Sequence, residues 1–151
     1  MTADDARHRT KVWMESRMLD ANLTDDAENE VYWKVAYGFP SYPLTRVFGY
    51  PKNVDLIYSI LDPTSEPRFN TDKTIIGYTE TVPIRISCID KQSITASKLK
   101  WTAERELRRI CETYPFGSLR LMDARKETTE RQGVTVIYGL ELTITYVRDT
   151  T

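Results

Sequence analysis

The sequence predicts an α+β fold: a single domain, residues 1–151, in which a mixed or antiparallel β-sheet with a long C-terminal hairpin packs against two main helices. Two observations carry this prediction. Apolar residues alternate with mostly polar ones from Val134 to Tyr146, which is the pattern of a half-buried strand. Between Ser93 and Tyr114 the apolar residues recur at helical spacing instead. A chain of this length buries roughly two thirds of its unfolded surface, so one core suffices without disulfides.

The chain changes character once. Residues 1–70 are aromatic and punctuated by prolines, whereas residues 71–151 are regularly patterned, so we interpret the first part as an elaboration on a strand–helix–hairpin core. Thr2, followed by acidic residues, is an N-cap candidate for a helix through Leu19. The basic residues of that helix are expected on a solvated face, as in other helices of mixed charge: Arg7, Arg9, Lys11 and Arg17.

The segment that follows allows two interpretations. VYWKVAY, residues 31–37, fits an alternating strand and also the last two turns of a helix that begins at Asp25. Gly38 and Pro40 end the element either way. Residues Phe39–Lys52 have no clear period, which indicates a long packed loop, and loops of this length in a compact domain are usually functional or interfacial.

Three segments then lead to the main helix. Val54–Asp62 alternates with two rather apolar sides and predicts a strand, and residues 63–73 are rich in turn formers, which predicts a loop. Residues 74–90 predict a second strand, at whose Pro83 the strand is an edge or a bulge because proline cannot donate a hydrogen bond. The face of this strand that we expect in the core carries Val82, Ile84, Ile86 and Cys88.

The main helix is predicted from Ser93, a good N-cap residue, to Tyr114, and Pro115 and Gly117 end it. Its apolar face carries Leu99, Ala103, Leu107, Ile110, Cys111 and Tyr114, and we expect its charged residues to lie away from that face: Lys98, Glu104, Arg105, Glu106, Arg108, Arg109 and Glu112. Two strands joined near Gln132-Gly133 follow. The last one, if straight, would span on the order of 45 Å. Gly139 is therefore expected to mark a bulge or bend, unless the polar end, residues 124–132, projects.

Composition excludes several classes of protein. The net charge of −1 and the sequence pI near 5.9 do not match the basic footprint of a dedicated nucleic-acid binder. No apolar run is long enough for a membrane helix, so we expect a soluble, intracellular product. Cys88 and Cys111 lie in apolar patterns that favour reduced, buried thiols, although sequence alone leaves open whether the two are close.

Few residues could carry chemistry. His8 is the only histidine, and no glycine-rich phosphate-binding motif or metal-ligand spacing occurs. The segment Asp90-Lys91-Gln92-Ser93 could be an active-site corner beside a helix N-terminus. Helix capping and a polar turn explain the same residue types. We therefore expect no enzyme activity, no cofactor and no metal.

Three segments in order, VPIRISCIDK, AERELRRICETYP and GLELTITYVR, resemble the tail terminator, or tail completion, proteins of tailed phages and related viruses. The resemblance covers about half of the chain. It implies a structural virion protein without catalysis, a ring of typically six copies that caps the tail tube and docks the connector or neck proteins. DNA would pass through the lumen without sequence-specific binding, no membrane would be involved, and the protein, made in the host cytoplasm, would end up in the tail or neck.

A ring subunit needs a head-to-tail contact whose two surfaces differ. We expect such surfaces on the hairpin Asp123–Gly133, on the exposed side of the main helix and on the loop Phe39–Lys52. The candidate interface residues are Arg105, Arg108, Arg109, Arg125, Lys126, Glu127, Glu130, Arg131, Tyr42 and Tyr50. Two other hypotheses stay open: a cellular ligand- or peptide-binding adaptor built on the aromatic N-terminal half, and an enzyme that uses Asp90 with Lys91 or a nearby glutamate.

Overall fold

The computed structural model of the chain describes residues 3–24, 31–38, 55–89, 96–132 and 135–149. Within these ranges the elements are, in chain order, α1 (Ala3–Arg17), the short 3-10 helix η1 (Asp20–Asn22), β1 (Trp33–Tyr37), β2 (Leu56–Ile60), β3 (Thr64–Phe69), β4 (Ile75–Ile89), α2 (Ala96–Thr113), β5 (Arg120–Gln132) and β6 (Thr135–Asp149). Six strands in the described residues form one sheet in the order β1-β2-β4-β6-β5, and β3 pairs with β4. Only β1 and β2 pair in parallel, so the predicted α+β fold with a mixed sheet is confirmed.

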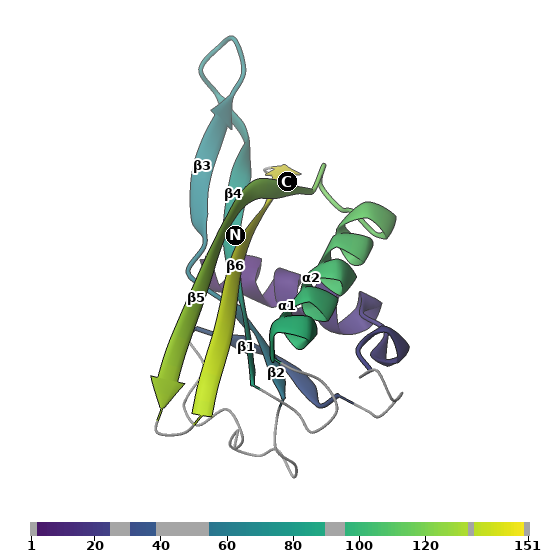
Figure 1. Cartoon of the computed structure of the whole chain (residues 1–151). Coiled ribbons are helices and arrows are strands. Elements are labelled where there is room, and N and C mark those ends of the chain that lie inside the picture. The colour runs from purple at the N-terminus through teal and green to yellow at the C-terminus, as the bar shows by residue number, and fades with distance from the viewer. Residues whose placement is uncertain (1–2, 25–30, 39–54, 90–95, 133–134, 150–151) are drawn as a thin grey trace.

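Both helices pack on one face of the sheet (Figure 1). On that face the strands place the alternating apolar side chains that the sequence predicted, including Ile84 and Ile86 of β4 and Leu142 and Ile144 of β6, all fully buried. Period-two alternation puts one set of side chains under the helices. The same core cluster takes in residues from both halves of the chain, from Trp13 in α1 to Tyr146 in β6.

α2 buries a more continuous apolar face than α1 does. On α2 the predicted apolar positions are buried from Leu99 to Cys111, and Tyr114, just past the helix end, stays 38% exposed. On α1 the large apolar side chains of Trp13 and Met14 are buried together with the small Ala6 and Thr10, whereas Val12 is half exposed. The expectation that the basic residues of α1 lie on a solvated face is wrong in part, since the guanidinium carbon of Arg9 lies 4.4 Å from the Phe116 ring centroid. Long basic side chains lay their stems on apolar surface in this way.

Residues 33–37 form a strand, so the strand interpretation of VYWKVAY holds there. β1 pairs with β2, whose five residues are all buried, as a strand with two apolar sides requires. The predicted helix start at Asp25 and the loop Phe39–Lys52 lie outside the described residues.

The predicted loop at residues 63–73 is wrong, because Thr64–Phe69 form β3, antiparallel to the first part of β4. All six side chains of β3 are exposed, so no alternation marks this strand in the sequence. A tight turn joins it to β4: Asn70 Oδ1 accepts hydrogen bonds from the N–H groups of Asp72 and Thr74, at 2.9 and 3.0 Å. An asparagine that bonds the backbone ahead of it in this way is a common turn former.

The hairpin that projects is β3–β4, not the polar end of β5–β6 (Figure 1). β6 ends at Asp149, opposite Gly77, so the β3–β4 turn and its flanking residues extend past the end of the sheet. At the other end, the β5–β6 hairpin adds only two paired residues, Thr135 and Val136, beyond Ile137, the last partner of β4.

Gly139 is not a bulge, because it pairs in regular register with Ser87 and with Thr128. The irregularity of the hairpin lies in β5, between Leu121 and Arg125. What requires glycine at this position is space: a Cβ atom there would lie 2.5 Å from Thr128 Oγ1 and 3.0 Å from Arg85 Nη2.

Pro83 lies in β4, an interior strand. On one side of β4 it falls between the residues that pair with β2 and those that pair with β3. Its carbonyl accepts a hydrogen bond from the N–H of Leu61 at 2.9 Å. Leu61 belongs to the connection between β2 and β3, where the neighbour of β4 changes from one strand to the other. A residue without an N–H is tolerated there for the reason that the sequence predicted, a local edge.

Candidate functional site

The structure describes the side chains of half of the predicted interface residues: Arg105, Arg108, Arg109, Lys126 and Glu127. The side chains of Arg125, Glu130 and Arg131 are not among those described, and Tyr42, Tyr50, Asp90, Lys91 and Ser93 lie outside the described residues. The active-site hypothesis for Asp90 therefore stays a hypothesis.

The described interface candidates belong to separate surfaces. Arg105 and Arg109 line a recess between α2 and η1, whereas Arg108 lines another between α2 and β5. Glu127 pairs with Lys100 of α2, Oε1 to Nζ, at 3.6 Å, on the helical side of the sheet. Lys126, its neighbour in β5, therefore points to the other side.

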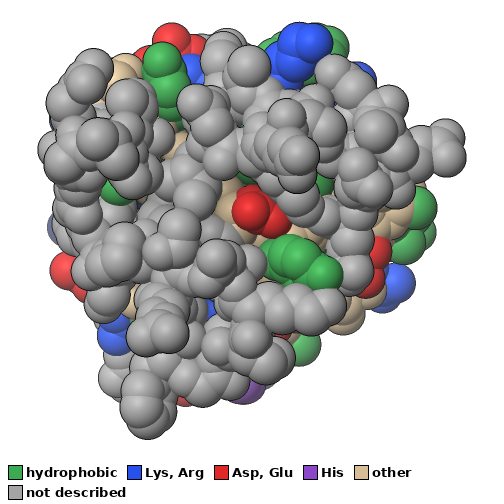
Figure 2. All heavy atoms as spheres, turned by 60° about the horizontal axis from the view of Figure 1, so that its bottom comes forward, with side chains coloured by type: hydrophobic (Ala, Val, Ile, Leu, Met, Phe, Trp, Pro, Cys, Tyr) green, Lys and Arg blue, Asp and Glu red, His purple; other side chains and the backbone are tan. Residues whose placement is uncertain are grey.

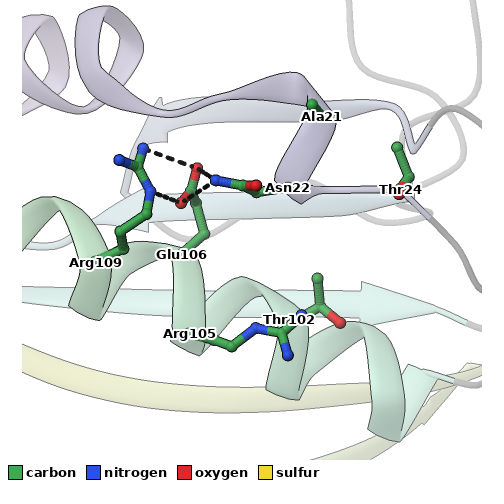
Figure 3. Close-up of a pocket in the computed structure, with 7 residues that line it drawn as sticks. All are labelled: Ala21, Asn22, Thr24, Thr102, Arg105, Glu106 and Arg109. Carbon is green, nitrogen blue, oxygen red and sulfur yellow. Dashed lines mark hydrogen bonds and ion pairs between the residues drawn. The ribbon is translucent and has the colours of Figure 1, made fainter.

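The first recess, which we call the η1–α2 recess, has a volume of about 460 Å³ and is lined by Ala21, Asn22, Thr24, Thr102, Arg105, Glu106 and Arg109 (Figure 3). At its inner end lies Glu106, which is 2% exposed. Its carboxylate accepts hydrogen bonds from the Leu19 N–H at 2.8 Å, from Asn22 Nδ2 at 3.1 Å and from the Arg109 guanidinium. The predicted exposed position of Glu106 is therefore wrong, as is that of Glu104, which is 5% exposed.

The burial of Glu106 follows from the way α1 ends. α1 stops at Arg17, and such a helix end leaves backbone groups without helical partners. Arg109 Nη2 donates to the Arg17 carbonyl at 2.8 Å, while Glu106 takes the Leu19 N–H. Arg109 and Glu106 thus provide one hydrogen-bond donor and one acceptor to the backbone where α1 ends and η1 begins. No spacing within α2 could reveal this, because the backbone groups come from about ninety residues away.

Of the two arginines in the recess, Arg109 pairs with Glu106, and the guanidinium of Arg105 lies near the mouth. The hydrogen bond to Glu106 raises the pKa of Arg109, so its guanidinium stays charged. Arg105 is exposed and stacks over Trp101, its guanidinium carbon 5.0 Å from the ring centroid. Arg105 and the threonine hydroxyls that line the recess can bind an acidic group.

A second hollow, the α2–β5 groove, lies where β5 begins. It comprises a cavity of about 300 Å³, lined by Arg108, Cys111, Glu112, Leu119, Arg120 and Leu121, and an adjoining one of about 240 Å³, lined by Arg120, Leu121, Met122 and Thr145. Its walls combine apolar side chains, among them Leu121 and Met122, with the charged side chains of Arg108, Glu112 and Arg120, and Met122 is 43% exposed. The sequence pointed to Arg108 here but missed Leu119–Met122, which precede the hairpin residues that it singled out.

The third surface is the β3–β4 arm, residues 64–81, which projects from the sheet (Figure 1). Three large hydrophobic side chains lie exposed at its far end: Phe69 (57% exposed), Ile75 (40%) and Ile76 (41%). Clusters of exposed apolar side chains on a soluble domain commonly mark interaction sites.

The base of the arm is fixed by buried polar contacts. Glu80, which is 2% exposed, accepts hydrogen bonds from Arg148 Nε at 2.6 Å and from Ser65 Oγ at 3.0 Å. The Arg148 guanidinium carbon also lies 4.1 Å from the Tyr78 ring centroid. These contacts join β3, β4 and β6, so the arm leaves the sheet in a defined direction.

The remaining reactive side chains are one histidine and two cysteines. His8 is exposed, with Nδ1 3.4 Å from the Tyr37 hydroxyl. Cys88 and Cys111 are both free and buried, and burial raises the pKa of Cys111 to about 12, which keeps its thiol protonated and unreactive. Within the part of the chain that the structure describes, no three His, Cys, Asp or Glu side chains gather closely enough to hold a metal ion.

Charges on the face seen from the bottom of Figure 1 are scattered. In Figure 2, acidic and basic side chains of described residues appear at separate places, and those of one sign form no patch among them. None of the described helices is long and apolar enough to cross a membrane.

No protein-family model and no curated protein matches this sequence.

Proposed function

We propose that this chain is a structural protein of a tailed virus, a tail terminator or head–tail joining subunit that acts by assembling into a ring. Its partners would be further copies of itself and the tail-tube and neck proteins, and it would act without catalysis. The order of sequence segments that resembles that family, together with the α+β fold, supports the proposal.

One observation carries the assembly part of the proposal. The β3–β4 arm is anchored at its base through Glu80 and ends in Phe69, Ile75 and Ile76, which its own sheet leaves exposed. Large apolar side chains at the end of a fixed projection gain stabilisation only when another surface covers them. Such an arm suits a subunit that functions in an assembly.

The direct test is the mass of the purified protein in solution over a range of concentrations, alone and with its tail-tube partner. The proposal predicts closed particles of more than two copies, with a central opening in negative-stain images. A protein that stays monomeric both alone and with the partner would rule it out.

The η1–α2 recess favours a second candidate function, a cellular ligand- or peptide-binding adaptor without catalysis. Its volume lies within the range of small-molecule sites, and Arg105 would meet an acidic group of the ligand. Citrate and peptides with a free C-terminal carboxylate are suitable probes in a thermal-shift assay. This function predicts a higher melting temperature with a probe, lost in Arg105→Ala; no shift with any acidic probe would contradict it.

A further inference from the structure

We propose that the α2–β5 groove receives the end of the β3–β4 arm of a second copy of this chain, so that copies join head to tail. This inference rests on the proposed function, because it supplies the contact by which the subunits would assemble.

The arm and the groove lie on different flanks of the same end of the sheet. β3 pairs with β4, while β5, which forms one wall of the groove, pairs with β6. Arg120 of the groove pairs with Thr145, and Thr145 pairs with Thr81 of β4. From Thr81 to the arm's end at Ile75 is roughly 20 Å along the strand.

The arm therefore points away from the groove of its own chain. Bending it back would break the buried contacts of Glu80 with Arg148 and Ser65. A contact between two different surfaces is heterologous, and it closes into a ring when the rotation between neighbours allows it. Placing arm and groove on opposite flanks is the arrangement that such a ring needs.

The two surfaces match in chemistry. Beside its charged residues, the groove presents the apolar side chains of Leu121 and Met122 to the apolar residues at the end of the arm. Its rim carries charges of both signs, Arg120 and Glu112. The turn of the arm also carries both signs, and a neighbouring copy can pair them with the opposite charges of the rim: Asp72 with Arg120, and Lys73 with Glu112. Charge pairs at a rim fix register and orientation.

The size of the contact explains why a closed ring is needed. The three exposed large hydrophobic side chains of the arm present roughly 250 Å² of surface, far less than the ~800 Å² per partner of a stable interface. A single contact of this size is weak. In a ring each copy uses both its arm and its groove, and the last contact forms within the assembly at a high effective concentration. We therefore expect monomers and closed rings, with few open intermediates.

The test uses one variant on each surface: Phe69→Glu disables the arm and Met122→Glu disables the groove. Both side chains are exposed, so the fold has no need of either. The matched control is Val12→Glu, a half-exposed apolar residue on α1 that belongs to neither surface. Circular dichroism melting checks that each variant is folded, and Ile75→Ser replaces the arm variant if Phe69→Glu does not fold.

Native mass spectrometry and analytical ultracentrifugation give the readout. We expect each variant alone to stay monomeric at concentrations at least ~10-fold above those at which the wild type and Val12→Glu assemble. A tenfold weakening is a modest loss for a contact that would have to bury a charge. Mixed in equal amounts, the two variants retain one intact contact, because the arm variant keeps an intact groove and the groove variant an intact arm. This single contact is weak, so the 1:1 pair should form only in concentrated mixtures.

Four outcomes would overturn the inference. If the wild type assembles and the variants assemble equally well, the arm–groove contact is wrong while the proposed function stands. Failure of a concentrated mixture to give any 1:1 pair, when each variant alone is monomeric, would show that the surfaces are not each other's partners. A groove variant that still self-assembles but no longer binds the tail-tube protein would assign the groove to that protein. A wild type that never assembles would remove the proposed function as well.

Discussion

Replacing Glu106 by alanine tests whether its carboxylate holds α1 and α2 together. The substitution removes the acceptor of the Leu19 N–H, of the Asn22 amide and of the Arg109 guanidinium. Because Glu106 is 2% exposed, water cannot fully replace it at the inner end of the recess. We expect the end of α1 to loosen and the whole domain to lose stability.

The magnitude follows from what each partner can do afterwards. Arg109 has a side chain 29% exposed and keeps its bond to the Arg17 carbonyl, and Asn22 is exposed, so both recover part of their loss in water. The Leu19 N–H loses a charged acceptor, which costs about 1.5–3 kcal/mol. With a smaller share from the ion pair, we expect Glu106→Ala to lower the free energy of unfolding by about 3 kcal/mol. In a chain of this length that corresponds to a fall in Tm of about 6–12 °C.

Urea unfolding followed by circular dichroism measures this loss. Glu15→Ala, an exposed glutamate on α1, is the matched control and should change stability by less than about 0.5 kcal/mol. Glu106→Gln keeps the size of the side chain and one acceptor, so it should fall between the two. A loss below about 1 kcal/mol for Glu106→Ala, or no difference from the control, would refute the clamp that we describe.

Three further predictions concern the sheet and the buried titratable groups. Gly139→Ala should lower the free energy of unfolding in urea by about 1–3 kcal/mol, because a Cβ would meet the Thr128 hydroxyl. Adding Thr128→Ala should recover part of this loss. An unchanged stability of the Gly139→Ala variant would contradict the close approach. Burial raises the pKa of both Cys111 and Tyr146 to about 12, above their unfolded values of 9.0 and 10.0, so the unfolded state loses these protons first. Stability should therefore fall as the pH rises from about 9 towards 12, and a flat profile of unfolding free energy in that window would refute this. At pH 8, thiol reagents should label Cys111 only under unfolding conditions, and rapid labelling of the folded protein would show that the thiol is accessible.

The parts of the fold that the sequence predicted are those where burial follows a simple period. β6 alternates because one face lies under the helices along its length, and α2 buries the stripe that begins at Leu99. Pro83 predicted a local edge from its missing N–H alone, and the change of partner from β2 to β3 provides that edge.

The arm could not be found from apolar periodicity because nothing in β3 is buried. Turn chemistry offered the available clue: Asn70, Asp72 and Lys73 lie between two runs that contain β-formers, which is the pattern of a hairpin. The projecting end was assigned to the wrong hairpin for a related reason. A polar segment such as residues 124–132 looks free in sequence, whereas backbone pairing with β6 holds it along the sheet.

The polar recess was also beyond the reach of sequence spacing. Glu106 and Arg109 are three residues apart on a helix, which is typical of an exposed ion pair. Their burial is decided by the backbone groups at the end of α1, and only the tertiary structure brings those groups to α2. The groove residues Leu119–Met122 escaped notice because they follow a turn and precede a bulge, where neither period applies.

The measurement that tests the central claim most directly is the mass of the wild-type protein beside that of the arm variant Phe69→Glu and of an equal mixture of this variant with the groove variant Met122→Glu. A subunit that joins head to tail through its arm gives closed rings for the wild type, monomers for the arm variant and, at high concentration, 1:1 pairs for the mixture. Rings that persist in the arm variant would contradict the arm's role, and a wild type that remains a single chain at every concentration, with and without the tail-tube protein, would contradict assembly itself.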